Sequence, residues 1–208
     1  MNKKDIKSIK YLLNQAKDKG TPKPIVFLGA GASISAGIPG ANRIKDDILE
    51  RFRDKPEIID LKEEQRTYYD LMRCLNTTER HELLRNYITH EKVKINVTNI
   101  YLANLLKLGY IDYILTVNFD DLMLRACALF NFLPPVYDIA ILKDFTTTTL
   151  QEKSVTYLHG QHNGFWLLNT KEELDKVRAS VPKILNRICH GRTWMTKTGR
   201  NLVKFPLI

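Results

Sequence analysis

The segment from Ile25 to Pro39 constrains the fold of this chain more than any other feature of the sequence. It opens with Ile-Val-Phe-Leu, a short apolar run typical of a buried strand. The run ends abruptly in Gly29-Ala30-Gly31-Ala32-Ser33, a glycine-rich turn followed by a helix start made of small residues. Backbone N–H groups in such a turn can approach a pyrophosphate, because no large side chain blocks the way. The segment therefore predicts an α/β fold with a nucleotide site after its first strand.

Further apolar runs predict more buried strands, two of them ending in polar residues. Tyr113–Val117 leads into Asn118-Phe119-Asp120, and Ser154–Leu158 leads into His159-Gly160. Another strand is predicted within residues 136–142. Strands that alternate with helices indicate a parallel sheet, in which ligands bind beyond the carboxyl ends of the strands. We therefore expect the glycine-rich turn, Asn118–Asp120 and His159 to meet at one edge of the sheet.

Helical spacing of apolar residues accounts for most of the remaining chain. An amphipathic helix with a basic, solvated face precedes the first strand and ends near Gly20, an interpretation that we prefer to a nucleic-acid-binding arm. Residues 41–95 predict helices throughout, which is long for a simple crossover and indicates a helical insertion beside the sheet. The predicted helices are Ala41–Phe52, Ile58–Leu75, Leu83–Ile88, one capped by Thr98 and stopping at Gly109, Leu122–Leu129, one with a capping box of Thr170 and Glu173 running toward Arg178, and Pro182–Gly191.

Composition excludes several classes of protein. The 208 residues suffice for one substantial domain, which we take as residues 1–208, and no apolar run approaches the ~20 residues of a membrane span. The N-terminus lacks the features of a signal peptide, so we expect a cytoplasmic protein without membrane contact. The three cysteines form no CxxC pair, and no HxxxH or carboxylate cluster occurs, so we expect no metal. The net charge of +9 is spread along the chain, which makes nucleic acid an improbable direct ligand.

Four motifs occur together in a characteristic order: GAGAS at 29–33, GIP at 37–39, TVNFD at 116–120 and HG at 159–160. In this order they resemble the sirtuin (silent information regulator) superfamily and the sirtuin-like NAD-cleaving domains of prokaryotic antiphage defence systems. The resemblance covers about residues 24–165. It implies a Rossmann-like parallel sheet with helices on both faces, NAD as the substrate, and cleavage of the nicotinamide–ribose bond.

The chain departs from the sirtuin pattern in three places. The zinc module with paired CxxC motifs is missing, which counts against a protein deacylase. The arginine of the family's GIPxFR stands one residue later, as Arg43, and Val117 replaces the usual glutamine. Thr193–Arg200 occupies the place where relatives have an apolar strand and a loop that binds the adenosine ribose. A divergent C-terminus and a C-terminally truncated chain both explain this departure.

The resemblance implies a role for each motif residue, and each has an alternative explanation. Gly29, Ala30 and Gly31 would bind phosphate, and Ser33 would donate to phosphate or cap the helix. Asn118 would orient water or ribose hydroxyls, or simply serve a turn. Asp120 would bind the nicotinamide amide or balance ribosyl charge, or cap a helix; His159 would act as general base, with His162 a weaker candidate, or be structural. Further NAD-binding positions are Gly37, Ile38, Pro39 and Thr116.

Three functional hypotheses follow. The first is an NAD+ glycohydrolase that releases nicotinamide and ADP-ribose as an antiphage effector, gated by homo-oligomerisation or by a partner such as an ATPase or helicase. The second is a module that binds NAD or ADP-ribose, or assembles with an ATPase, without catalysis. The third is an NAD-dependent protein deacylase.

Overall fold

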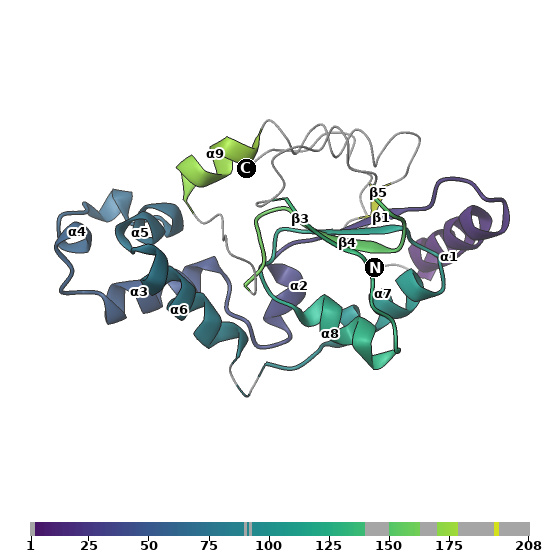
Figure 1. The fold of residues 1–208 in the computed structure, drawn as a ribbon, viewed down its shortest axis with the longest axis horizontal. Coiled ribbons are helices and arrows are strands. Elements are labelled where there is room, and N and C mark those ends of the chain that lie inside the picture. The colour runs from purple at the N-terminus through teal and green to yellow at the C-terminus, as the bar shows by residue number, and fades with distance from the viewer. Residues whose placement is uncertain are drawn as a thin grey trace.

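A parallel sheet lies at the centre of the molecule (Figure 1). The computed structural model describes residues 3–89, 91, 93–139, 150–162, 170–178 and 194–195. Within them the strand order is β3-β4-β2-β1-β5, and every pairing is parallel. The predicted α/β class is therefore confirmed, and the architecture is consistent with a Rossmann-like fold. The strands are β1 (Ile25–Leu28), β2 (Tyr113–Thr116), β3 (Val136–Asp138), β4 (Ser154–Tyr157) and β5 (Trp194–Met195).

The register of the strands aligns the carboxyl ends of β1, β2 and β4. Leu28 at the end of β1 pairs with Thr116, and Thr116 pairs with Tyr157 at the end of β4. The next residues continue this alignment, because the N–H of Val117 donates to the Leu28 carbonyl and that of Leu158 to the Thr116 carbonyl. The three following loops therefore start at the same level of the sheet.

Two helices cover one face of the sheet, α7 (Val97–Lys107) and α8 (Leu122–Leu129), as Figure 1 shows. A hydrophobic cluster is buried between these helices and the sheet. Its strand residues are every second residue of each strand, because successive side chains of a strand point to opposite faces. Helix α1 (Lys3–Asp18) reaches the same core through Leu13, and its Lys17 ammonium lies 4.1 Å from the Tyr110 ring centre. The fully buried members include Ala103, Leu106, Ile114, Ala126, Cys127, Val155 and Tyr157.

A separate group of helices, which we call the helical insertion, lies beyond the carboxyl edge of the sheet (Figure 1). Its own core includes Ile48, Leu71, Met72 and Leu84, all fully buried. The helical insertion consists of α3 (Ala41–Arg51), α4 (Pro56–Ile59), the 3-10 helix η1 (Glu63–Gln65), α5 (Tyr68–Cys74) and α6 (Thr77–Ile88).

The prediction of one helix over Ile58–Leu75 is wrong, because this stretch contains α4, η1 and α5. Pro56 opens α4, and the hydroxyl of Thr67 accepts a hydrogen bond from the Asp70 N–H to begin α5 afresh. Apolar residues from all these short elements reach one core, so helical spacing across the breaks was coincidental.

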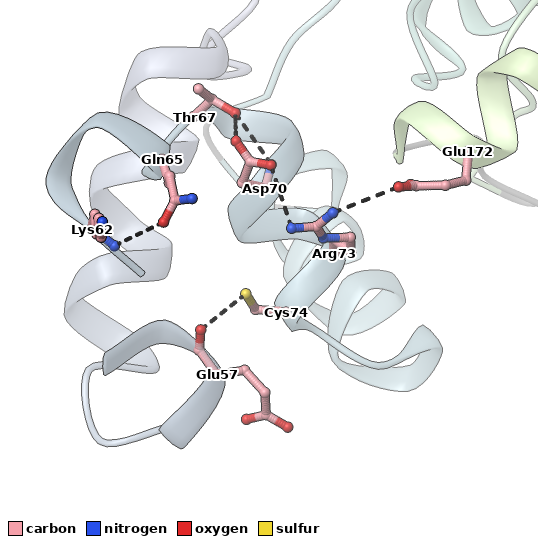
Figure 2. Close-up of polar contacts among 8 residues, drawn as sticks. All are labelled: Glu57, Lys62, Gln65, Thr67, Asp70, Arg73, Cys74 and Glu172. Atoms are coloured by element: carbon pink, nitrogen blue, oxygen red, sulfur yellow. Dashed lines mark hydrogen bonds and ion pairs between the residues drawn. The ribbon is translucent and has the colours of Figure 1, made fainter. Parts of the chain in front are cut away.

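Helix α9 (Lys171–Arg178) lies against the helical insertion through ion pairs. Arg80 on α6 contacts Glu173 at 2.9 Å. Arg73 on α5 contacts Glu172 at 3.7 Å, as Figure 2 shows. The predicted capping box is confirmed, since the Thr170 hydroxyl accepts from the Glu173 N–H at 3.3 Å and the Glu173 carboxylate from the Thr170 N–H at 3.1 Å.

The predicted cap of α7 is wrong, because the helix begins at Val97 and its N-cap is Asn96, two residues before Thr98. The Asn96 Oδ1 accepts from the Asn99 N–H at 3.0 Å, while its Nδ2 donates to the Ala32 carbonyl at 2.6 Å. An amide can accept and donate at once, so Asn96 both caps α7 and holds the turn after β1.

Some predictions fall outside the described residues: the strand beyond residue 139, helix Pro182–Gly191, and Thr193–Arg200 apart from β5. No helix among the described residues combines the length and apolar character needed to cross a membrane.

Candidate functional site

The glycine-rich turn after β1 folds into one helical turn, α2 (Gly31–Ile34). The Gly29 and Ala30 carbonyls accept from the N–H groups of Ala32 and Ser33 at 2.8 and 3.0 Å, while Ala30 and Gly31 are exposed. A helix of four residues has only a small dipole, so attraction of an anion depends here on individual N–H groups. The Ala30 N–H donates to no other described residue, which leaves it available.

Gly29 itself is not required by the protein's own packing. A Cβ built on Gly29 meets no atom within 4 Å, and its φ is not in the left-handed region. Gly37, by contrast, has a φ of +97°, which disfavours any residue with a side chain. Open space over the Gly29 α-carbon is what close approach of a ligand to the backbone needs.

Three predicted site residues form a buried hydrogen-bond network between the loops after β1 and β2. The Ser33 hydroxyl donates to Asp120 Oδ2 at 2.6 Å. Asn118 Nδ2 donates to the Ser33 Oγ at 2.8 Å and to the Gly29 carbonyl at 3.1 Å. Ser33 is thus neither the N-cap of α2, a position held by Ala30 without a side-chain bond, nor directed at solvent. The capping explanation of Ser33 is therefore wrong.

This network fixes the orientation of the Asn118 amide. The Gly29 carbonyl can only accept a hydrogen bond, so the atom that faces it must be the amide nitrogen. Both Nδ2 hydrogens are used within the network, and the Asn118 Oδ1 takes part in none of these bonds. A ligand or water would therefore meet Asn118 as a hydrogen-bond acceptor.

Asp120 is engaged through both carboxylate oxygens. In addition to the bond from Ser33, its Oδ1 accepts from the Leu122 N–H at 3.2 Å, at the start of α8. The side chain is buried, and this burial raises the pKa of Asp120, with the two hydrogen bonds acting in the opposite direction. These contacts match the helix-start explanation of Asp120.

His159 follows β4 and belongs to the same edge, next to the loop that carries Asn118. It is half-buried, and this burial lowers the pKa of its imidazole, which keeps the ring neutral near pH 7. Its imidazole makes no hydrogen bond within the described part of the chain. Gly160 turns the backbone away at a φ of +85°.

The other predicted positions make contacts within the protein next to the network. The Thr116 hydroxyl accepts from the Asn118 N–H at 3.0 Å, and Ile38 is buried beside Ile88 and Leu122. Pro39 is half-buried next to Ile38. Arg43 forms an ion pair with Asp47 at 3.2 Å on its own helix, α3.

Two residues that sequence reasoning missed hold the loop after β2. The Tyr157 hydroxyl, fully buried, donates to the Asp120 carbonyl at 3.0 Å. Phe119 packs into the core of the helical insertion and also against the cluster around Ile38, and its carbonyl accepts from the His162 N–H at 2.8 Å. The sequence offered one signal for each residue. Tyr157 carries a polar hydroxyl group within a predicted strand, and Phe119 is an aromatic residue between the motif residues Asn118 and Asp120.

The fold and this network define a Rossmann-like α/β protein with a polar site at the carboxyl edge of its sheet. A scan against known protein families gives no match for this chain, and a comparison with curated proteins gives none either. Within the described residues, no group of three or more His, Cys, Asp or Glu side chains could hold a metal ion.

Proposed function

We propose that this protein is a sirtuin-like NAD+ glycohydrolase, which converts NAD+ and water into nicotinamide, ADP-ribose and a proton. The observation that carries the proposal is the junction of the loops after β1 and β2. There the open Gly29 backbone lies directly against Asn118, 3.1 Å from its amide nitrogen to the Gly29 carbonyl. A dinucleotide needs both close backbone approach and polar groups at the strand ends.

In this proposal the turn after β1 binds the pyrophosphate. The exposed Ala30 N–H would donate to a phosphate oxygen, and the space over Gly29 would admit the phosphate to the backbone. Gly37 ends the turn, and the Asn96 side chain holds it from outside through the Ala32 carbonyl. The turn is therefore preorganised before a ligand arrives.

The glycosidic bond of NAD+ breaks through a transition state in which positive charge develops on the ribose. Nicotinamide leaves as a neutral base, so the site needs no acid for the leaving group. Asn118 Oδ1 would accept from the attacking water or a ribose hydroxyl, and neutral His159 would take the water's proton. Ser33 and Asp120 then act as positioning residues, because Asp120 accepts from the Ser33 hydroxyl, which in turn accepts from the Asn118 amide.

A non-catalytic NAD- or ADP-ribose-binding module is the second candidate. The observation that favours it is the saturation of Asp120, both of whose oxygens bond within the protein. The defence role, oligomeric gating and an ATPase or helicase partner rest on the motif resemblance alone.

Chromatography of NAD+ after incubation with the purified protein tests the first candidate. We expect nicotinamide and ADP-ribose in equal amounts, with turnover lost in Asn118→Ala and His159→Ala and kept in Asn86→Ala, an exposed asparagine on α6. Calorimetric binding of NAD+ without release of nicotinamide would select the second candidate instead. An acyl-peptide assay with mass detection tests deacylation.

A Gly29→Ala variant separates a ligand site from a structural turn. Because the added methyl meets no atom and φ is not positive, the free energy of unfolding should stay the same or rise by up to about 1 kcal/mol. NAD+ binding should nevertheless weaken about tenfold or more, because the methyl occupies the space of the phosphate. Unchanged NAD+ affinity in a stable Gly29→Ala protein would remove the main support for the proposal.

A further inference from the structure

A cavity lies on the helical insertion. Its volume is about 430 Å³, and most of its described lining residues come from one face of α6, with His162 added from the loop after β4. Small-molecule sites commonly span roughly 300–1,000 Å³. The described residues that line this cavity are all polar or charged, and three of them are threonines: Thr77, Thr78 and Thr89.

Four ionisable side chains line the same cavity: His81, Glu82, Arg85 and His162. In the described part of the chain, no hydrogen bond or ion pair engages the first three, and His162 Nδ1 is buried without a partner. The charged residues on the other side of α6 behave differently. Glu79 pairs with Lys55, and Arg80 pairs with Glu173 at 2.9 Å.

The two arginines of α6 differ in exposure. Arg80 is 14% exposed and pairs with Glu173, whereas Arg85 is exposed and pairs with no described residue. The Arg85 guanidinium is therefore accessible to a ligand in the cavity, where hydroxyl groups, imidazole rings and one carboxylate lie beside it. Such a set of donors around an unpaired guanidinium suits a phosphate group. Glu82 and the threonines add acceptors for hydroxyl hydrogens.

We propose that this cavity binds a phosphate monoester carried on a hydroxyl-rich group, such as a sugar phosphate or a nucleotide. Arg85 binds the phosphate, His81 and His162 donate to its oxygens, and Glu82 and the threonine hydroxyl groups bind the sugar. A bare phosphate ion would leave most of the 430 Å³ unfilled. The proposal does not depend on NAD+ cleavage, and none of the residues in the network of Ser33, Asn118 and Asp120 takes part in it.

The cavity is nevertheless connected to the loop of that network. The His162 N–H donates to the Phe119 carbonyl at 2.8 Å, between Asn118 and Asp120 in the chain. A ligand that contacts His162 therefore acts on a residue bonded to this loop.

Isothermal titration calorimetry of the whole chain at physiological salt tests the proposal with three probes: ribose 5-phosphate, ribose and inorganic phosphate. Ribose 5-phosphate should bind, ribose should not, and inorganic phosphate should bind at least tenfold more weakly than ribose 5-phosphate. Arg85→Gln should weaken binding of ribose 5-phosphate about tenfold or more, because a charge-assisted bidentate contact is lost. Arg51→Gln, an exposed arginine in the last turn of α3, is the matched control and should bind as the wild type does.

Three results would overturn the proposal: equal binding of ribose and ribose 5-phosphate, full affinity in Arg85→Gln, or an equal loss in Arg51→Gln. If Arg85→Gln does not fold, Arg85→Lys keeps the charge, and its loss of the planar fork should still weaken binding. Asn118→Ala should keep the affinity for ribose 5-phosphate, and a loss there would assign binding to the network instead. A wild-type protein that binds ribose 5-phosphate without cleaving NAD+ would overturn only the proposed function.

Discussion

Replacing Ser33 with alanine tests whether the buried network stabilises the loops at the carboxyl edge of the sheet. The Ser33 hydroxyl donates to the Asp120 carboxylate at 2.6 Å and accepts from the Asn118 amide at 2.8 Å, and only 4% of Ser33 is exposed. A hydrogen bond to a charged group contributes about 1.5–3 kcal/mol and one between neutral groups about 0.5–1.5 kcal/mol. Alanine gains a few tenths, roughly 0.5 kcal/mol, in helix propensity within α2. The expected net loss is therefore about 1.5–4 kcal/mol.

The matched control is Ser35→Ala, two residues further along the same turn. Ser35 is exposed, and its hydroxyl accepts only from Asn96, which keeps its bond to the Ala32 carbonyl. The expected cost of this change is below about 1 kcal/mol. Urea denaturation at unchanged slope measures both losses, and a loss of about 3 kcal/mol corresponds to a fall of about 6–12 °C in Tm for a chain of this size.

A double-mutant cycle identifies the partner. If Ser33 acts through Asp120, the combined variant Ser33→Ala/Asp120→Asn should lose about 1–2 kcal/mol less than the two single losses added together. Equal losses for Ser33→Ala and Ser35→Ala would refute the reasoning, because the buried network would then contribute no more than an exposed contact. Strict additivity in the cycle would refute the assignment of Asp120 as the partner.

Three further predictions concern titration and ion pairs. Burial raises the folded-state pKa of Asp120 above the unfolded value of about 3.9. Its carboxyl group therefore favours folding at low pH, and this contribution is lost as pH rises through the folded pKa. Urea midpoints measured from pH 4 to 8 should show the stability of the wild type falling relative to that of Asp120→Asn. Burial lowers the pKa of the His159 imidazole. On the proposed function, kcat/KM should therefore stay constant as pH falls past the usual histidine pKa of about 6.5, and it should decrease only at lower pH. A decrease centred at or above about pH 6.5 would contradict the role of His159 as base. Arg80→Met should raise hydrogen exchange in α9 more than Arg73→Met does, because Arg80 is less exposed than Arg73 (14% against 56%) and closer to its partner (2.9 against 3.7 Å); the reverse order would contradict this ranking.

Local sequence patterns predicted well those elements whose position depends on residues close together in the sequence. The buried strands after Pro24, after Asp112 and after Lys153 lie at the predicted places, since each is a short apolar run between polar turns. The capping box of Thr170 and Glu173 also depends on residues three apart. The helices within residues 56–75 were predicted less well, because periodicity cannot reveal where a side chain such as Thr67 restarts a helix.

The site could be predicted only to the level of the strand ends. Parallel pairing brings the loops after β1 and β2 together whatever their side chains do, so their meeting follows from topology. Which atoms bond is decided between residues 87 positions apart, Ser33 and Asp120, and no local pattern carries that information. The same limit applies to the cavity on α6. His81 on α6 and His162 after β4 are distant in the sequence, yet they line the same cavity in the structure.

The hydrogen bonds that the network uses also determine what it still offers to a reacting group. Asn118 has committed its amide hydrogens, so its Oδ1 accepts, and the unprotonated nitrogen of His159 accepts as well. On the proposed function, a group that binds both acceptors must bring hydrogens of its own, as water and ribose hydroxyls do. The carbonyl oxygen of an acylated lysine has none. On the proposed function, this pair of acceptors therefore favours water over an acyl peptide as the group that receives the ribosyl cation, which is the chemical difference between a glycohydrolase and a deacylase.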